Sequence, residues 1–333
     1  MANAYESMTT EELDAAIAQL EADVERLRAK GLSLDMARGK PSPEQVDLSR
    51  PMLDALASTS DLTDGGVDAA NYGCPDGLPS ARALMADILG VDVANVVLGG
   101  SSSLNIMSDV VLHGWVKGVR GCEPQVLQAQ RGPLKFLCPS PGYDRHFAVS
   151  ANAGFENVPV AMGPDGPDMD EVRRLVEGDP AVKGIWCVPK YSNPTGITYS
   201  DETVRRMAAL KPAAPDFRIF WDNAYVVHDL TDTPDELLEV FGAVAEAGND
   251  DLVYEFASTS KVTFPGSGIA AVAASAADAD DLRAWFGVER VCCDKITQLA
   301  HARWLPNAAA VRAHMAEPAR VLRPRFQLVE RKL

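Results

Sequence analysis

The chain has 333 residues, enough for one large α/β domain with a smaller one, or for two medium domains. Hydrophobic residues make up 47% and charged residues 23%, which is ordinary for a protein with a full core. The net charge of −16 opposes binding to the phosphates of nucleic acid, so no nucleic-acid partner is expected. No apolar stretch has the length of a membrane span, and the N-terminus lacks the pattern of a secretory signal, so we expect a cytoplasmic protein without membrane contacts.

The N-terminal stretch predicts one amphipathic helix. Thr9 or Thr10 is a suitable cap before Glu11 and Glu12, because acidic residues favour the first turn. Apolar residues then recur at three- and four-residue spacing, which indicates one apolar face. They are Leu13, Ile17, Leu20, Val24 and Leu27. Residues 38–51 are rich in turn formers and are expected to cross between parts of the structure.

From about residue 80, short apolar runs alternate with helical patterns such as residues 201–210. Runs of this kind are typical of strands in a mainly parallel sheet that helices cover on both faces. We therefore predict an α/β fold, a three-layer αβα domain with seven strands. Pro159 favours an edge or a bend within its run. The seven runs are 95–98, 134–138, 156–161, 184–188, 218–222, 252–257 and 269–274.

Unusual residues follow the ends of several predicted strands, where open parallel sheets bind ligands. Gly100, Ser101 and Ser102 stand where a helix begins, which indicates an anion site, although a simple serine cap is the ordinary alternative. Tyr143 and His146 follow the second run, and a tyrosine packed on the surface is the alternative there.

Three further strand ends carry polar groups. Asn193 stands in the turn sequence NPTG, Asp222 closes an apolar strand with Tyr225 three residues later, and Lys261 follows residues 252–257. Taken singly, a turn, a helix cap and a solvated lysine are the ordinary readings. Together the five strand ends offer partners for a phosphate, a flat ring, a protonated ring nitrogen and an aldehyde. That set matches pyridoxal 5'-phosphate.

Three motifs carry a family resemblance: SNPTG at 192–196, DNAY at 222–225 and STSK at 258–261. With them, the sequence from residue 37 onwards resembles the fold-type I pyridoxal-phosphate-dependent aminotransferases, and most of all the bacterial branch called type Ic aspartate aminotransferases. The resemblance implies amino-group transfer from aspartate to 2-oxoglutarate by a ping-pong Schiff-base mechanism. It also implies a homodimer that binds amino acids and 2-oxo acids in shared active sites.

The resemblance assigns roles around the cofactor ring. Lys261 resembles the lysine that holds the cofactor as a Schiff base and later moves a proton, and Asp222 resembles the carboxylate that keeps the ring nitrogen protonated. Tyr225 and Asn193 resemble the donors to the phenolic oxygen of the ring. Tyr143 resembles the aromatic residue stacked on it, and a histidine at the position of His146 supports the aspartate.

The resemblance also assigns the phosphate and substrate contacts. Gly100, Ser101 and Ser102 occupy the phosphate-binding turn, and Ser258 resembles a hydroxyl that binds the phosphate. Tyr72 resembles the tyrosine that reaches the phosphate of the neighbouring subunit. Gly39 resembles the glycine whose backbone meets the substrate carboxylate, in the same site as Asn193. No metal is expected.

Two features depart from the family pattern. Residues 262–270 lack the arginine that pairs with the phosphate in many relatives, so we expect Ser267 or backbone N–H groups to take its place. The last segment, 321–333, breaks off within an amphipathic pattern. We therefore expect a cofactor-binding domain of residues 51–299. Residues 1–50 and 300–333 are expected to form a small domain that lacks its C-terminal part and its carboxylate-binding arginine.

Several alternatives remain open at this stage. A β-lyase or decarboxylase on the same scaffold would share the cofactor contacts, and a chain without its small domain could be a non-catalytic binding fragment. Arg38, Lys40 and Lys190 are candidates to bind an acidic substrate side chain, or are solvated surface charges. The S-x-x-K motif of Ser258 and Lys261 is not that of a β-lactamase, because no K-T-G follows it. A DNA-binding regulator is disfavoured by the acidic N-terminal helix and the net charge.

Overall fold

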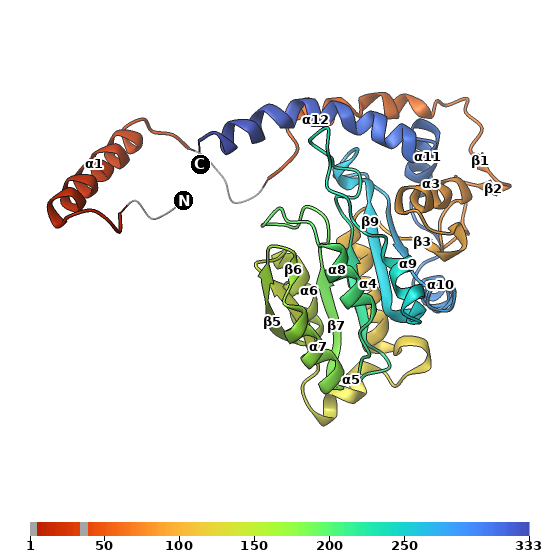
Figure 1. Ribbon diagram of the computed structural model, residues 1–333. Helices are drawn as coiled ribbons and strands as arrows, with labels where there is room; N and C mark the ends of the chain where they lie inside the picture. Colours follow the sequence, from red (N-terminus) through yellow and green to blue (C-terminus); the bar gives the residue numbers. More distant parts are fainter. Residues whose placement is uncertain (1–4, 34–38, 333) are drawn as a thin grey trace. The chain divides into compact units, whose positions relative to one another are not determined.

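The computed structural model describes residues 5–33 and 39–332 (Figure 1). The chain divides into two units, Met1–Pro41 and Ser42–Leu333. Within the first unit lies helix α1, Thr10–Arg28, whose cap was predicted. Thr9 Oγ1 accepts from the Glu12 backbone N–H at 3.3 Å, and Glu12 Oε2 accepts from the Thr9 N–H at 2.7 Å. This reciprocal capping box fixes the start of the helix.

The second unit is built around one eight-stranded sheet with the strand order β3-β10-β9-β8-β7-β4-β5-β6. All seven predicted strands are present in it, and the eighth is the two-residue β6. Strands β9, β8, β7, β4 and β5 run parallel, whereas β10 is antiparallel to both its neighbours and β6 is antiparallel to β5. The strands are β3 (Val96–Leu98), β4 (Lys135–Ser140), β5 (Glu156–Gly163), β6 (Gly166–Pro167), β7 (Val182–Cys187), β8 (Arg218–Asp222), β9 (Val253–Ser258) and β10 (Ala270–Ala273).

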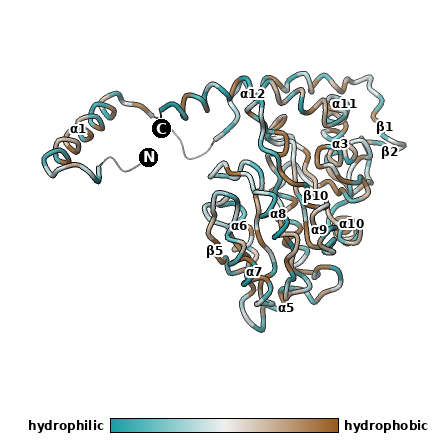
Figure 2. Tube along the Cα trace, in the orientation of Figure 1, coloured by the Kyte–Doolittle hydropathy of each residue, from teal (hydrophilic) through white to brown (hydrophobic). Residues whose placement is uncertain are grey.

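Helices cover both faces of the sheet, as the alternating pattern predicted (Figure 1). The longer ones are α3 (Pro79–Leu89), α4 (Ser103–Val116), α6 (Asp144–Ala153), α7 (Met169–Gly178), α8 (Asp201–Ala208), α9 (Val240–Glu246), α10 (Ala276–Glu289), α11 (Lys295–Trp304) and α12 (Ala308–Glu330). The short elements are α2 (Pro43–Asp47), α5 (Gln125–Gln128) and a hairpin of β1 (Thr63–Asp64) with β2 (Val67–Asp68). Hydrophilic and hydrophobic residues both occur along α12, which Figure 2 shows as a mixture of teal and brown.

Side chains alternate between the two faces along each strand, and this alternation divides the core. In β3, Val97 belongs to the cluster beneath α4 and α10, while Val96 and Leu98 belong to a cluster with α3 and α11. In β8, Phe220 joins the first of these clusters and Trp221 packs with α7, α8 and α9. Because both faces are buried, the central strands are mostly apolar, and this is why their sequences could be recognised.

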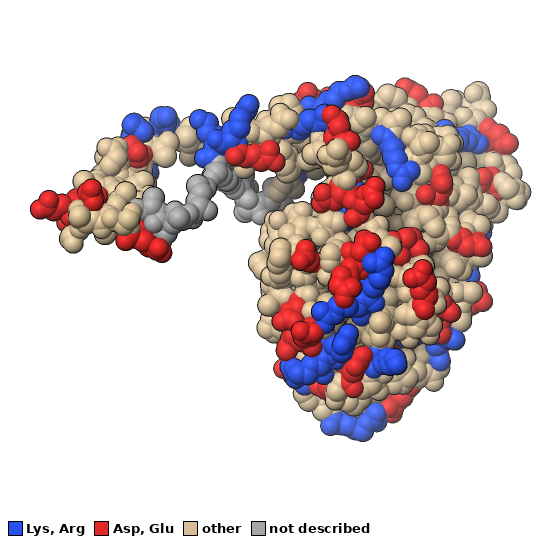
Figure 3. Space-filling view, in the orientation of Figure 1, with Lys and Arg blue, Asp and Glu red and all other residues tan. Residues whose placement is uncertain are grey.

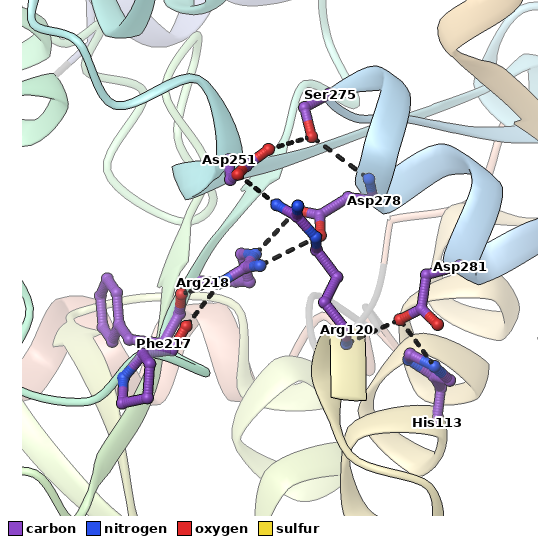
Figure 4. A network of polar contacts seen from close by, with 9 residues as sticks. His113, Arg120, Phe217, Arg218, Asp251, Ser275, Asp278 and Asp281 are labelled. Atoms are coloured by element: carbon purple, nitrogen blue, oxygen red, sulfur yellow. Dashed lines mark hydrogen bonds and ion pairs between the residues drawn. The ribbon is translucent and has the colours of Figure 1, made fainter. Parts of the chain in front are cut away.

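The amino-terminal edge of the sheet is closed by a network of ion pairs (Figure 4). Arg218, the first residue of β8, is buried and donates to both carboxylate oxygens of Asp278 at 2.8 and 3.0 Å. Arg120 pairs with Asp251 and contacts Asp278. Buried charges need such partners, because an unpaired charge in the interior is costly. The charges of Arg218, Arg120 and Asp278 at this edge therefore have partners of opposite sign.

The surface carries charges of both signs. On the face seen in Figure 3, acidic and basic side chains are interspersed over the second unit. Many of the pairs are local, such as Arg174 with Glu171 at 2.7 Å on α7 and Arg205 with Asp201 at 3.3 Å on α8. Exposed pairs of this kind contribute little to stability, on the order of 0–1 kcal/mol each.

Candidate active site

Asp222 ends strand β8 at the carboxyl edge of the sheet and is 4% exposed. Its Oδ2 lies 3.0 Å from Nε2 of His146, in helix α6, so one carboxylate oxygen has a partner. The other oxygen, Oδ1, is buried and has no hydrogen-bond partner among the described residues. A buried carboxylate oxygen without a donor is costly, so this atom is an acceptor that lacks its donor.

His146 is held in place by aromatic rings. Its ring stacks on Trp186 of β7, with ring centres 4.6 Å apart and planes 17° apart. Tyr143 meets the same imidazole edge-on at 5.0 Å. Trp186 in turn stacks on Phe136 of β4 at 4.8 Å. These contacts fix the imidazole and, through it, the Asp222 carboxylate, and they bring the predicted residues Tyr143, His146 and Asp222 together.

Lys261 follows strand β9, at the end of the short 3₁₀ helix Thr259–Lys261. Its side chain is exposed, and its Nζ lies 4.3 Å from the centre of the Tyr225 ring. The ring of Tyr225 also meets His228 edge-on at 5.5 Å. The predicted lysine and phenol thus share one side of the site, on the loops that follow the adjacent strands β9 and β8.

His228 was not singled out from the sequence, although it stands only three residues after Tyr225. Its Nε2 donates to the backbone carbonyl of Lys261 at 3.3 Å, and its Nδ1 is buried without a partner among the described residues. Burial, assisted by the charge of Lys261, lowers the pKa of His228 to about 4. At neutral pH this imidazole is uncharged and supports the backbone that carries Lys261.

The predicted phosphate turn lies between β3 and helix α4. Gly100 adopts φ +70°, a conformation that few residues other than glycine tolerate. Ser260 Oγ donates to the Ser101 carbonyl at 3.2 Å and lies 2.8 Å from Ser258 Oγ, so the hydroxyls after β9 adjoin this turn. A Cβ atom at Gly268 would lie 2.7 Å from the Ser101 carbonyl oxygen. This close approach explains why the last residue of the turn 265–268 is a glycine.

Asn193 is exposed on the loop after β7 and lines a cavity of about 680 Å³ together with Tyr225 and His228. Arg323 of α12 lines the same cavity. The loop is closed by a bond from the Ser192 backbone N–H to the Ile197 carbonyl at 2.8 Å. Two of the predicted residues, Asn193 and Tyr225, therefore line a space large enough for a small organic molecule.

The structure corrects the reading of Lys190. Its side chain is buried, and its Nζ pairs with Asp229 Oδ1 at 2.7 Å. The hydroxyl of Tyr191 donates to the same oxygen at 3.0 Å. Lys190 is therefore neither a solvated surface charge nor a free cation for a substrate. Asp229, 39 residues away in the sequence, had no signal that linked it to this lysine.

The remaining predicted residues have no contact with Asp222 or Lys261 among those described above. Tyr72 is 81% exposed, and its backbone carbonyl accepts from the buried Lys295 at 3.3 Å. Ser267 Oγ is 3.4 Å from Thr297 Oγ1. Gly39 and Lys40 are exposed residues of the first unit, and Arg38 lies outside the described residues.

Comparison with known proteins decides the family. The aspartate amino-transferase family profile matches residues 8–333. The chain belongs to the aspartate amino-transferase family. An aspartate aminotransferase of Corynebacterium glutamicum is 42% identical in an alignment of 334 positions that covers 97% of this chain and 75% of that protein. The chain thus spans about three quarters of the length of this relative.

Solved structures of aminotransferases share the fold. The crystal structure of an aspartate transaminase from Corynebacterium glutamicum has a TM-score of 0.90 and 41% identity, over 96% of this chain and 75% of that one. An α-aminoadipate aminotransferase from Thermus thermophilus, complexed with N-(5'-phosphopyridoxyl)-L-leucine, shares the fold at a TM-score of 0.68 and 20% identity, over 87% of this chain and 68% of that one.

The residues of this aminotransferase-family chain fit pyridoxal phosphate. The unpartnered Asp222 Oδ1 matches the N–H of a protonated pyridine ring. The exposed Lys261 amine matches an aldehyde, and the turn at Gly100 with the hydroxyls of Ser258 and Ser260 matches a phosphate. No cluster of three or more histidine, cysteine or acidic residues suited to a metal occurs in residues 5–33 and 39–332. Within the same ranges, no helix combines the length and apolar character needed to span a bilayer.

Proposed function

We propose that this chain is a pyridoxal-phosphate-dependent aminotransferase that transfers the amino group of aspartate to 2-oxoglutarate. One observation carries the proposal: the buried Asp222 is paired with His146 on one oxygen and lacks a donor on the other, and it ends the strand next to β9, which leads to Lys261. The choice of aspartate rests on the family and on its Corynebacterium glutamicum relatives.

Each residue then has a defined task. When bound, pyridoxal phosphate supplies an aldehyde that accepts an amino group and a ring that withdraws electrons. Asp222, oriented by His146, would hold a proton on the ring nitrogen. Tyr225 and Asn193 would donate hydrogen bonds to the phenolic oxygen, and Tyr143 would pack against the ring. Lys261 would hold the cofactor through its Nζ, and the same amine would serve as the base that moves a proton at the α-carbon of the substrate.

We further propose that the cofactor lies within residues 51–299, and that Gly39 and Tyr72 complete the site. In this proposal Gly39 meets the substrate carboxylate, and Tyr72 reaches the phosphate of a second copy of the chain. Tyr72 is 81% exposed, so its side chain is accessible to a second copy of the chain.

The cofactor assignment is tested by titration and chemical trapping. The purified chain mixed with pyridoxal phosphate should develop a visible absorption band, and borohydride followed by peptide mapping should place the label on Lys261. Lys261→Ala should lose the label, whereas Lys211→Ala, at an exposed position, should keep it. A label on another lysine would overturn the assignment.

The reaction is tested with an amino-donor screen against 2-oxoglutarate. Aspartate should give the highest kcat/KM, and Asp222→Ala should lower kcat by at least ~10²-fold while the protein stays folded, because the ring nitrogen would lose its proton. Near-normal turnover of this variant would contradict the role of Asp222. Release of ammonia or carbon dioxide without conversion of 2-oxoglutarate to glutamate would instead favour a lyase or a decarboxylase.

A further inference from the structure

The phosphate turn is adjoined by an arginine from a distant part of the chain. Arg290 caps the C-terminal end of helix α10. Its NH2 donates to the carbonyl of Leu98 at 2.8 Å. Leu98 is the last residue of β3, and the turn with Gly100, Ser101 and Ser102 follows at once. Arg290 therefore holds the strand end from which the turn starts.

The guanidinium group is clamped against the backbone of this turn. A Cβ atom at Gly99 would lie 2.7 Å from Arg290 NH1, so only glycine lets the guanidinium come so near. The other face of the guanidinium lies 4.0 Å from the centre of the Phe286 ring, a cation–π distance. Gly99 and Phe286 together fix the position of the charge beside the turn.

The guanidinium of Arg290 has N–H groups without acceptors among the described residues. A guanidinium has five N–H groups, but Arg290 Nε is buried without a hydrogen-bond partner. Across the described residues, no carboxylate lies within ion-pair distance of Arg290, and its charge acts at longer range on Asp109, whose raised pKa it partly lowers. Arg82 and Arg283, by contrast, both reach Asp76, at 3.1 and 3.6 Å. A partly buried cation without a counter-ion favours a nearby anion.

We propose that Arg290 supplies the positive charge of the phosphate site, in the role left vacant by the missing arginine after Lys261. This inference rests on the proposed function. Arg290 is a positioning residue: it fixes the strand end through Leu98, and its charge strengthens the binding of a dianion at the turn, because charges interact over several ångströms in a partly buried site. The sequence of residues 262–270 has no cation of its own for this task.

The test compares two ligands that differ only in the phosphate. Dissociation constants of pyridoxal phosphate and of pyridoxal are measured by absorbance titration for the full chain and for Arg290→Gln, Arg290→Lys and Arg283→Gln. Arg290→Gln should weaken pyridoxal phosphate by about 10- to 100-fold and pyridoxal by less than about twofold, because one charge-assisted contribution is lost only where a phosphate is present. Arg290→Lys, which keeps the charge, should recover part of the affinity. Arg283→Gln, on the same helix, should leave both constants unchanged.

Inorganic phosphate gives a second readout, because it should compete with pyridoxal phosphate for the same site. Its competition should be weaker in the Arg290→Gln variant than in the unmodified chain. If Arg290→Gln weakened the binding of pyridoxal phosphate and of pyridoxal equally, or weakened neither, the role of Arg290 would be overturned. If Arg290→Gln does not fold, the affinities of Arg290→Lys decide between these outcomes. Failure of the unmodified chain to bind either vitamer would instead overturn the proposed function.

Discussion

Glu255 lies in the central strand β9 and is 3% exposed. Its Oε1 accepts from Asn223 Nδ2 at 2.9 Å, while its Oε2 is buried without a partner among the described residues. Burial raises the pKa of Glu255 to about 8. This carboxyl group is therefore protonated at neutral pH, and its hydrogen-bond partner Asn223 directly follows Asp222 in the chain.

The raised pKa makes stability depend on pH in a defined direction. The contribution of Glu255 is fully present below its unfolded pKa of 4.5 and is lost as the pH rises towards 8, because the unfolded chain releases the proton first. Glu255→Gln, which carries no charge at any pH, should be more stable than the parent chain by roughly 2–4 kcal/mol near pH 8 and by little near pH 5. Urea unfolding at pH 5, 6, 7 and 8 measures this, with the exposed Glu246→Gln as the control. A difference that does not change with pH would contradict the assignment.

Strand β7 passes beneath an aromatic ring at Gly184. A Cβ atom there would lie 2.3 Å from Phe136 Cζ, so the ring would have to move. Phe136 stacks on Trp186, and Trp186 stacks on His146, which holds Asp222. Gly184→Ala should therefore lower the free energy of unfolding by about 1–3 kcal/mol and also weaken pyridoxal phosphate binding.

The matched control is Gly178→Ala, at the C-terminal end of α7, where a Cβ would meet no atom within 4 Å. It should leave the cofactor affinity unchanged and alter stability by less than about 1 kcal/mol. Thermal unfolding and a cofactor titration test both variants. A Gly184→Ala chain with normal stability and normal affinity would show that the stack adapts without cost.

The elements that the sequence predicts best are those whose apolar pattern is continuous. All seven predicted strands were located to within a few residues, and all of them except β5, which is largely exposed, are buried along most of their length. Strand β6, Gly166–Pro167, has no apolar run, and the antiparallel direction of β10 follows from its neighbours and not from its own residues. The site residues next to strand ends were equally visible. Arg290 and Asp229 were not, since their partners lie far away in the sequence.

At the scale of the whole molecule, each active site of the proposed homodimer combines Lys261 of one subunit with Tyr72 of the other. Tyr72 is 81% exposed, and Lys295 holds its segment by donating to the carbonyls of Asp68 and Tyr72 at 2.9 and 3.3 Å. Tyr72→Phe should weaken pyridoxal phosphate by about tenfold through the loss of one hydrogen bond to a charged group. Lys261→Ala should remove covalent attachment.

Mixing these two variants separates a shared site from an unshared one. If subunits exchange at random, half of the dimers are mixed, and each mixed dimer contains one site with both residues intact, so about one quarter of all sites should regain tight covalent binding. Borohydride trapping at a cofactor concentration below the dissociation constant of the Tyr72→Phe chain counts these sites. Sites built within a single copy would give no gain in covalent binding on mixing. Sedimentation would then show whether the chain is a monomer or a dimer whose sites are not shared. The recovered quarter, by contrast, can arise only if Tyr72 of one copy serves Lys261 of the other.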